Sequence, residues 1–380
     1  MSKWKKVKLG DVATYINGCA FKPSDWSFQG VPIVRIQNLT GSFSETNYYD
    51  KPYNSKYEIN NGDVLISWSA SLGVYVWNKG TAILNQHIFK VVFDKINIDK
   101  NYFVFAVKSL LEKMEKQTHG ATMKHITKPL FDNMSFPLPP MEEQKKIAAL
   151  LDAVSDLLAK QKQLLAKQDT LIQSLFYDMF GTPEINEKNF ITKKISELCQ
   201  LNPKKPNGIP DNTECSFVPM PLVSEDGNLN PTQIRLYKDV KKGFTYFEEG
   251  DVLFAKITPC MENGKGAIAK NLKNKFGFGS TEFHVLRPLN GISNARWLFQ
   301  ITKFKKFREN AEKSMTGSAG QKRVPIGFFE KYVVALPPLE LQEKFAAIVE
   351  QIESEKSKIK SAIAETQTLF NALMAEYFEE

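Results

Sequence analysis

The sequence predicts an α+β protein that consists of two similar globular blocks, each followed by one long helix. Three observations support this prediction. Motifs of the first half recur in the same order in the second half, each block alternates short β-type segments with helical patterns, and two long stretches keep an unbroken heptad spacing. The chain has 380 residues, more than one hydrophobic core usually serves, so more than one domain is expected.

Three pairs of motifs carry the internal repeat. The string FPLPPMEEQ at residues 136–144 recurs as VALPPLELQ at residues 334–342, an offset of 198 residues. NGDVL at residues 61–65 recurs as EGDVL at residues 249–253 with an offset of 188, and KLGDV at residues 8–12 resembles KISEL at residues 194–198 with an offset of 186. Because the offset grows along the chain, the second half has gained residues between its landmarks, mostly after Leu253.

Each globular block has the pattern of an α+β domain. Runs rich in Val, Ile, Phe and Tyr are broken by Gly, Pro and Asn, which is typical of short strands. The strand candidates are residues 33–36, 63–68, 87–93, 217–220, 251–257 and 282–286. Helical patterns follow at residues 101–117 in the first block and 295–311 in the second. This mixture predicts an α+β fold for both blocks.

Two long helices are expected at residues 141–180 and 339–380. Each follows a Pro-Pro pair and carries Glu in its first turn, and Gly181 followed by Pro183 ends the first helix. Apolar side chains recur at 4-3 spacing in both helices, which favours coiled-coil packing. The coiled-coil candidates are Ile147, Leu151, Val154, Leu158, Leu165 and Ile172 in the first helix, and Phe345, Val349, Ile352, Ile359, Ile363 and Phe370 in the second.

The length of these helices predicts how they pack. A helix of forty residues is about 60 Å long, about twice the width of a small domain. We therefore expect the helices to project from the blocks and to pair as an antiparallel coiled coil, which would relate the two halves by a pseudo-two-fold axis. Gln161, Gln168, Lys356 and Thr366 interrupt the apolar seam, and such polar residues can fix the register of pairing. The alternative is that each helix packs on its own block.

These features divide the chain into four expected segments. The first block comprises residues 1–138 and the first long helix, as a spacer, residues 139–181. The second block comprises residues 182–336 and the second long helix residues 337–380.

Positive charge is concentrated in the globular blocks. The chain has 50 Lys and Arg against 42 Asp and Glu, a net charge of +8. The two long helices hold 9 basic and 15 acidic residues, so the remainder holds 41 basic and 27 acidic residues, a net charge of +14. Such segregation is expected of surfaces that face phosphate groups. A solvated surface without a partner is the alternative.

Several other classes of protein are disfavoured. Residues 1–10 lack the apolar core of a secretion signal, and no apolar run approaches the ~20 residues that cross a bilayer. The four cysteines, Cys19, Cys199, Cys215 and Cys260, follow no metal-binding or disulfide spacing, so a reduced, cytoplasmic protein is expected. The sequence contains no phosphate-binding loop, adenine-methyltransferase motif or metal-ligand spacing, so we expect no catalytic residue and no metal site.

The ordered, duplicated motifs resemble the specificity subunit of type I restriction–modification systems, the HsdS family. The resemblance rests on Leu-Pro-Pro-x-x-x-Gln before each long helix, on Gly-Asp-Val-Leu in each block, and on TGSAGQKRVP at residues 316–325. It covers essentially the whole chain. Two departures concern the first block: His119 stands where the second block has Thr316, and Trp68 stands in place of Lys256, where the family often has a basic residue.

The resemblance implies a function for each segment. Each block is a target-recognition domain that reads one half of a split DNA sequence, and the helices set the distance between the blocks and dock partner subunits. The implied partners are double-stranded DNA, two modification subunits that bind S-adenosylmethionine and methylate adenine, and translocating restriction subunits. The chain itself is expected to bind no cofactor, to contact no membrane and to have no catalytic activity.

Candidate DNA-binding residues follow from charge and from the geometry of base recognition. Basic residues position a protein on phosphates, whereas amide, hydroxyl and Arg side chains read base edges. The candidates in the first block are Arg35, Gln37, Asn38, Lys116, Thr118, His119, Thr122, Lys124 and His125. Those in the second block are Lys256, Lys306, Arg308, Thr316, Ser318, Gln321, Lys322 and Arg323. Each has the alternative of being a solvated loop side chain.

Two functions of other classes compete with DNA reading. A coiled-coil scaffold with paired binding domains for protein or glycan would favour neutral or acidic blocks, whereas these blocks are basic. A sequence-specific endonuclease would need an acidic cluster with Lys in each copy. Glu248, Glu249, Asp251 and Lys256 have no charged equivalents in the first block except Asp63.

Overall fold

The fold is described from a computed structural model of the whole chain, which describes residues 4–41, 46–117, 126–183, 185–318 and 320–379. The chain divides into two compact units, residues 1–163 with 360–380, and residues 164–359. Each unit therefore contains one globular block together with a part of both long helices, α4 (Met141–Phe180) and α9 (Leu339–Phe378). The predicted four-segment division instead treats each helix as a separate segment.

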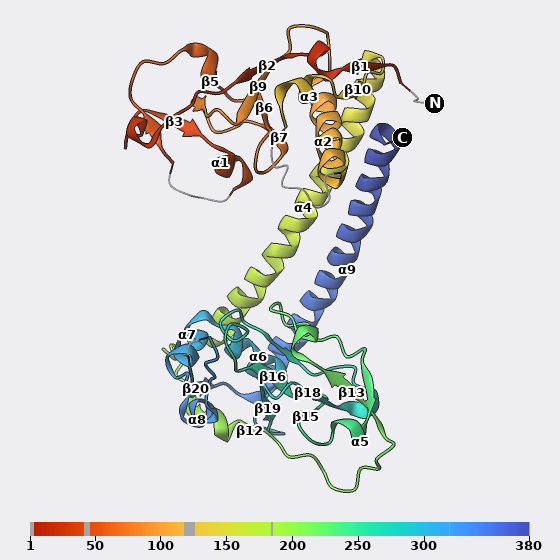
Figure 1. Cartoon of the computed structure of the whole chain (residues 1–380). Helices are drawn as coiled ribbons and strands as arrows, with labels where there is room; N and C mark the ends of the chain where they lie inside the picture. Colours follow the sequence, from red (N-terminus) through yellow and green to blue (C-terminus); the bar gives the residue numbers. More distant parts are fainter. Residues whose placement is uncertain (1–3, 42–45, 118–125, 184, 319, 380) are drawn as a thin grey trace. The chain divides into compact units, whose positions relative to one another are not determined.

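The block of unit 1 contains two four-stranded sheets and a two-stranded ribbon (Figure 1). The first sheet has the order β2-β9-β6-β7 and the second the order β4-β3-β8-β5, with β3 and β8 parallel. The ribbon pairs β1 with β10. The strands are β1 (Lys6–Lys8), β2 (Thr14–Asn17), β3 (Val31–Val34), β4 (Tyr48–Tyr49), β5 (Glu58–Ile59), β6 (Val64–Ser67), β7 (Gly73–Val76), β8 (Ala82–Leu84), β9 (Ile88–Val92) and β10 (Ser135–Pro137).

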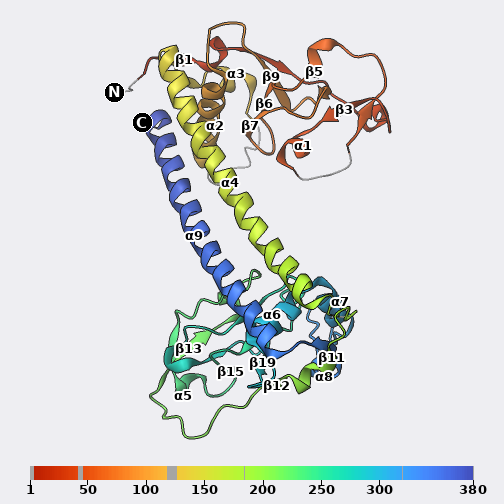
Figure 2. The same ribbon diagram turned by 180° about the vertical axis from the view of Figure 1, so that it is seen from behind.

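The helices of unit 1 pack in two different cores. They are α1 (Ile36–Thr40), α2 (Lys100–Gln117) and α3 (Lys128–Asp132), together with the first part of α4 and the last part of α9. Helix α2 shares one core with Val64 and Ile66 of the first sheet, whereas α1 packs with Leu65 and the second sheet. In Figures 1 and 2, α2 lies alongside α4. The core joins Tyr102 and Phe103 of α2 to Phe136 of β10, all fully buried. Burial of such aromatic side chains contributes most of the stability of a block this size.

The block of unit 2 repeats this topology. Its sheets have the orders β12-β19-β16-β17 and β14-β13-β18-β15, again with one parallel pair, β13 and β18, and its ribbon pairs β11 with β20. The strands are β11 (Ile191–Lys194), β12 (Cys199–Leu201), β13 (Glu214–Val218), β14 (Ile234–Leu236), β15 (Thr245–Glu248), β16 (Val252–Ala255), β17 (Gly266–Ile268), β18 (Phe276–Gly279), β19 (Phe283–Pro288) and β20 (Val333–Leu336). The identical strand order confirms the α+β internal repeat predicted from the motifs.

The helical pattern predicted at residues 295–311 is two helices rather than one. Unit 2 contains α5 (Tyr237–Val240), α6 (Ala295–Lys303), α7 (Lys305–Lys313) and α8 (Ile326–Lys331), together with parts of α4 and α9. The break falls at Phe304, which has an extended backbone with ψ 138°. Its ring packs on Phe176 of α4 with the centroids 4.8 Å apart. The buried Phe304 ring therefore lies at the break between α6 and α7. The apolar periodicity of the sequence does not predict this break.

The two long helices pair antiparallel within each unit. In unit 1, Ile147, Leu151, Val154 and Leu158 share a core with Phe370, Met374 and Phe378. In unit 2, Ile172, Phe176 and Phe180 share a core with Phe345, Val349 and Ile352. Each end of α4 therefore packs on the opposite end of α9, which the antiparallel coiled coil requires. Three candidate seam residues are only half-buried: Leu165, Ile359 and Ile363.

A buried glutamine fixes the start of each long helix. The side chain of Gln144 donates to the carbonyl of Pro139 and accepts from the backbone N–H of Asp99, both at 2.9 Å. Gln342 makes the equivalent bonds, at 2.9 Å, to the carbonyl of Pro337 and from the N–H of Asn294. The Gln of the repeated Leu-Pro-Pro-x-x-x-Gln motif thus ties the proline turn to the segment that begins α2 or α6.

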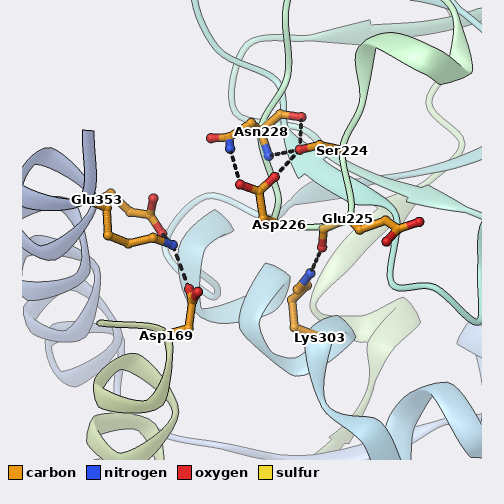
Figure 3. A network of polar contacts seen from close by, with 8 residues as sticks. Asp169, Ser224, Glu225, Asp226, Asn228, Lys303 and Glu353 are labelled. Carbon is orange, nitrogen blue, oxygen red and sulfur yellow. Dashed lines mark hydrogen bonds and ion pairs between the residues drawn. The ribbon is translucent and has the colours of Figure 1, made fainter. Parts of the chain in front are cut away.

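A polar network surrounds the helix pair in unit 2 (Figure 3). Lys356 of α9 donates to Asp169 of α4 at 2.7 Å and contacts Glu353 at 3.3 Å. Lys303 of α6 donates to the backbone carbonyl of Glu225. Glu225 lies in a turn in which the Ser224 hydroxyl donates to the carboxylate of Asp226.

Across the residues that the structure describes, no helix is both long enough and apolar enough to cross a membrane.

Candidate nucleic-acid interface

The second block presents a short hairpin, residues 316–323 (of which residue 319 lies outside the described residues), at one end of its first sheet. Thr316 and Arg323 exchange two backbone hydrogen bonds, of 3.0 and 2.8 Å, and the N–H of Gln321 donates to the carbonyl of Ser318 at 3.1 Å. The turn needs Gly317 and Gly320, which have φ of 120° and 80°, a region that L side chains rarely adopt. The two glycines of the TGSAGQKR string therefore explain why the chain turns here.

The 316–323 hairpin is fixed to the end of strand β16. The N–H of Thr258 donates to the carbonyl of Lys322 at 3.1 Å, and the N–H of Val324 donates to the carbonyl of Lys256 at 2.9 Å. Lys256 in turn donates its own N–H to the carbonyl of Glu282 at 2.9 Å, which continues the pairing of β16 with β19. The hairpin is thus an extension of the sheet, with its backbone position set by the strands.

The side chain of Arg323 is bound by Glu282, immediately before β19. The guanidinium donates from Nε at 2.9 Å and from Nη2 at 2.8 Å to the two carboxylate oxygens, and from Nη1 at 3.0 Å to the carbonyl of Gln321. Bidentate pairs of this kind are the strongest and most directional ion pairs. The hydrogen bond from Arg323 holds the pKa of Glu282 below its usual value, so the pair is ionised at neutral pH.

A buried histidine supports the same junction. One ring nitrogen of His284, Nε2, lies 2.8 Å from the carbonyl of Val324, and the other, Nδ1, lies 3.2 Å from the amide nitrogen of Asn202. Burial lowers the pKa of His284 to about 4, although its bond to the Val324 carbonyl opposes that shift. The ring is therefore neutral at pH 7, with Nε2 as donor and Nδ1 as acceptor. Sequence reasoning missed Glu282, His284 and Asn202 as parts of this site, because they lie far from residues 316–323 in the chain.

The predicted DNA-binding residues of the second block other than Arg308 fall into three groups. Thr316, Ser318, Gln321 and Lys322 are exposed on the hairpin, and Lys256 is half-buried beside it. Lys306 is exposed on α7, a separate element. Arg323 is the last residue of the hairpin, and its guanidinium donates to the carboxylate of Glu282 and the carbonyl of Gln321.

Arg308 was predicted to contact DNA, and the structure corrects this prediction. Its side chain is buried, and it donates to the carbonyls of Thr302 at 2.6 Å and Met261 at 2.8 Å. The guanidinium also lies 4.3 Å from the ring centroid of Phe254, in cation–π contact. Arg308 therefore ties α7 to the 261–265 turn, and its position on α7 gave no sequence signal of this burial.

The first block has an equivalent junction with different side chains. The N–H of Ile126 donates to the carbonyl of Trp68 at 2.9 Å, and the N–H of Trp68 donates to the carbonyl of His87 at 3.4 Å. Trp68 therefore occupies the position of Lys256, and His87 that of Glu282. The Trp68 ring stacks on Phe89 with centroids 5.6 Å apart, so aromatic side chains stand where the second block has Lys256 and Glu282.

Five of the first-block candidates lie outside the described residues: Thr118, His119, Thr122, Lys124 and His125. Lys116 is exposed in the last turn of α2.

The remaining candidates of the first block lie in helix α1 or at its N-cap. Asn38 accepts, at 2.9 Å, a hydrogen bond from the backbone N–H of Arg35, whose guanidinium lies 5.0 Å from the ring centroid of Trp26. Gln37 and Asn38 line a cavity of about 260 Å³ together with Trp77. Arg35, Gln37 and Asn38 thus follow β3 directly, with Arg35 as the N-cap of α1 and Gln37 and Asn38 within the helix.

The acidic residues of the repeated Gly-Asp turn have structural partners. Asp251 is buried, and Arg287 donates to both of its oxygens at 2.8 Å. Asp63, its equivalent, lies 3.1 Å from Lys90. Both carboxylates also accept a backbone N–H, from Glu248 and Asn60. Among the described residues, no group of three or more potential ligands could hold a metal ion. The arrangement offers little support for the endonuclease alternative.

Comparison with protein families finds one domain type twice in the chain. Residues 1–167 and residues 187–366 both match the type I restriction modification DNA specificity domain. The two matches coincide with the two halves of the internal repeat.

Curated relatives and a solved structure agree with this match. The type I restriction enzyme EcoAI specificity subunit of Escherichia coli is 46% identical over 162 residues, 42% of this chain and 27% of that protein. The EcoEI specificity subunit of Escherichia coli is 41% identical over 202 residues, 53% of this chain and 32% of that protein. The matched part thus spans about a third of these relatives or less. A type I restriction-modification S subunit from M. genitalium has the same fold, with a TM-score of 0.61 at 14% identity over 100% of this chain and 97% of that one.

Proposed function

The chain belongs to the family of the type I restriction modification DNA specificity domain, and from this membership we propose that it reads a DNA site in two parts. Each block recognises one half, and the bases between the halves go unread. One observation carries the proposal: two basic blocks of identical strand order each bear the same junction between a sheet edge and a loop, at Trp68 in one and Lys256 in the other.

The second block offers the clearest reading surface. Thr316, Ser318 and Gln321 are exposed hydroxyl and amide side chains on a hairpin with a fixed backbone, and such groups form hydrogen bonds with base edges. Lys322 and Lys306 add exposed positive charge for phosphate contacts, which position a protein on the duplex. In the first block, the same roles fall to Arg35, Gln37 and Asn38 around α1 and to Lys116.

The long helices act as a spacer between the two reading surfaces. The antiparallel pairing found within each unit supports this role, because a helix pair is stiffer than a loop of the same length. Two-fold DNA readers contact half-sites about 34–36 Å apart, one turn of the duplex. The length of α4 and α9 therefore sets the number of unread base pairs.

The same helices serve as a platform for partner subunits. Leu150 and Leu157 in unit 1, and Leu164 and Leu171 in unit 2, recur every seven residues on α4 and are 41–50% exposed. Residues at this spacing share one face of a helix, and an exposed apolar face is typical of a protein-binding surface. Two modification subunits that methylate adenine with S-adenosylmethionine fit this surface, and translocating restriction subunits would join them.

The chain contributes recognition rather than chemistry in this assembly. We infer that it has no catalytic activity and binds no cofactor of its own, and that it works in the cytoplasm, where the DNA and the partner subunits are found. The charge of its blocks favours DNA over the scaffold alternative, in which the blocks would bind protein or glycan.

The proposal is tested by mapping methylated adenines in cells that express the full chain and in cells that lack it. We expect a methylated motif with two defined halves and a gap of fixed length, present only when the chain is expressed. Methylation that does not depend on the chain would contradict the proposal.

A further inference from the structure

The second block holds a carboxylate at the centre of its basic reading surface. Glu282 belongs to the strand edge beneath the 316–323 hairpin, and its side chain is 23% exposed. Its carboxylate repels DNA phosphates, so its presence at this surface requires a compensating interaction. The carboxylate makes that interaction with Arg323, as a bidentate ion pair.

The pair adds a side-chain link between the hairpin and the sheet edge, beyond the backbone bonds that join them. The 316–323 hairpin has exposed side chains at Thr316, Ser318, Gln321 and Lys322, so apolar burial does not fix it. Its attachments to the sheet are the backbone bonds at Thr258 and Val324, the His284 contact to the Val324 carbonyl, and the Glu282–Arg323 pair. Of these, the ion pair is the side-chain link closest to the turn.

We propose that Glu282 and Arg323 position the 316–323 hairpin for DNA reading, so that Arg323 is a positioning residue rather than a base-contacting one. Base contacts then come from Thr316, Ser318 and Gln321, and Lys322 contacts a phosphate. This inference rests on the proposed function. It changes the role first predicted for Arg323, because three of its five donor hydrogens point to Glu282 and to the Gln321 carbonyl.

The first block has no carboxylate at the position of Glu282. Trp68 and His87 stand where Lys256 and Glu282 stand in the second block, and their rings lie 5.3 Å apart. An aromatic contact of this kind is insensitive to salt, whereas an exposed ion pair is screened. The positioning role therefore applies to the second block, and only the half-site read by that block should respond to its loss.

The variant Glu282→Ala distinguishes base reading by Arg323 from hairpin positioning by Arg323, because the two roles predict opposite effects on affinity for the preferred duplex. The Glu282→Ala variant has one more net positive charge and frees the guanidinium. If Arg323 reads a base, this variant binds its preferred duplex as well as the wild type or better. If the pair positions the hairpin, binding to the preferred duplex weakens by about tenfold or more, although binding to random DNA strengthens.

The experiment selects preferred duplexes from a random pool with the full chain, together with the subunits that co-purify with it. Binding is then measured for Glu282→Ala, Arg323→Ala and the double variant. We expect each variant to lose affinity for the preferred duplex, and the double variant to lose less than the two single losses added together, since either change breaks the same pair. The exchanged pair Glu282→Arg with Arg323→Glu should recover part of the loss, and Arg323→Lys should lie between wild type and Arg323→Ala. Asp211→Ala is the matched control, since it removes another exposed carboxylate paired with a lysine of this block, Lys241, at 2.6 Å.

A second measurement does not depend on DNA. Hydrogen exchange of the Thr316 and Arg323 amides, which bond across the hairpin, should accelerate in Glu282→Ala and Arg323→Ala but not in Asp211→Ala. Unchanged exchange, or unchanged affinity in Glu282→Ala, would overturn the positioning role while leaving the proposed function intact. Failure of the wild type to select any motif would overturn the proposed function itself.

Discussion

The buried ammonium of Lys356 on α9 lies 2.7 Å from the carboxylate of Asp169 on α4, within the helix seam. Desolvation would lower the pKa of Lys356, but the hydrogen bond to Asp169 and the charge of Glu353 outweigh it, and the pKa lies above its usual value. Lys356 is therefore charged and paired in unit 2. A buried ammonium paired across the seam favours a single register of the helices, because sliding either helix would separate Lys356 from Asp169.

Removal of Asp169 should therefore destabilise the helix pair more than replacement of Lys356. We expect Asp169→Ala to lower the free energy of unfolding by about 1–3 kcal/mol, since it leaves a buried charge with only Glu353 as partner. Lys356→Leu should change the same quantity by less or raise it, because an apolar residue fits the seam. Urea denaturation measures both, and Glu355→Ala, which breaks the exposed Lys358–Glu355 pair, is the control. A larger loss for Lys356→Leu than for Asp169→Ala would contradict this reasoning.

The buried glutamine before each long helix should be a strong determinant of stability. In Gln342→Ala, the N–H of Asn294 and the carbonyls of Pro337 and Ile292 lose their partner. We expect the free energy of unfolding to fall by about 2–4 kcal/mol, because buried groups left without hydrogen bonds are expensive. Denaturant titration checks this, with Gln351→Ala, at an exposed glutamine of the same helix, as control. Equal effects of the two variants would show that the motif glutamine has another role.

Sequence patterns were sufficient for the parts of the fold that depend on local periodicity. The six expected strands overlap β3, β6, β9, β13, β16 and β19, and both long helices lie where the heptads place them. Strand β18 has no such signal, because Gly277 and Gly279 disfavour strands. They are needed there since a Cβ at Gly279 would lie 2.4 Å from the carbonyl oxygen of Val218 on the neighbouring strand.

The candidate site was only partly accessible from the sequence, for a physical reason. The exposed hairpin residues stand together in one string, which a motif reveals. Glu282, His284 and Asn202 reach the same place through strand pairing across long stretches of chain, and nothing local marks them. At Arg308 the sequence suggested a site residue that the structure does not place in the site. A basic side chain suggests a phosphate contact, but the Arg308 guanidinium donates hydrogen bonds to buried backbone carbonyls.

His284 should make stability depend on pH in a defined window. Its pKa is about 4 in the folded chain and 6.5 in an unfolded chain, so between these values only the unfolded chain takes up the proton. The free energy of unfolding should therefore fall as the pH falls from about 6.5 to about 4, by at most about 3 kcal/mol. Glu282, whose pKa is lowered by Arg323, adds its own loss only below pH 4.5. Thermal or urea unfolding between pH 4.5 and 6.5 should show a shallower slope in His284→Gln than in the wild type. An identical slope would exclude a contribution from His284.

The spacer role of the helices predicts a change in the recognised site when their length changes. Insertion of seven residues into both α4 and α9 keeps the heptad pattern and lengthens each helix by about 10.5 Å. We expect the unread gap of the selected DNA motif to grow by about three base pairs, with both half-sites unchanged. An insertion of four residues interrupts the seam and serves as the control. A constant gap in the seven-residue variant would mean that the helices do not set the spacing.

The most direct test of two-part reading is a selection of random duplexes with the wild type and with a variant confined to one block. The variant carries Ser318→Ala and Gln321→Ala, two exposed hairpin changes that leave the fold intact. We expect the wild type to select a split motif, and the variant to relax one half of it while the other half and the gap stay the same. Changes in both halves, or a motif without a gap, would contradict the division of recognition between the two blocks.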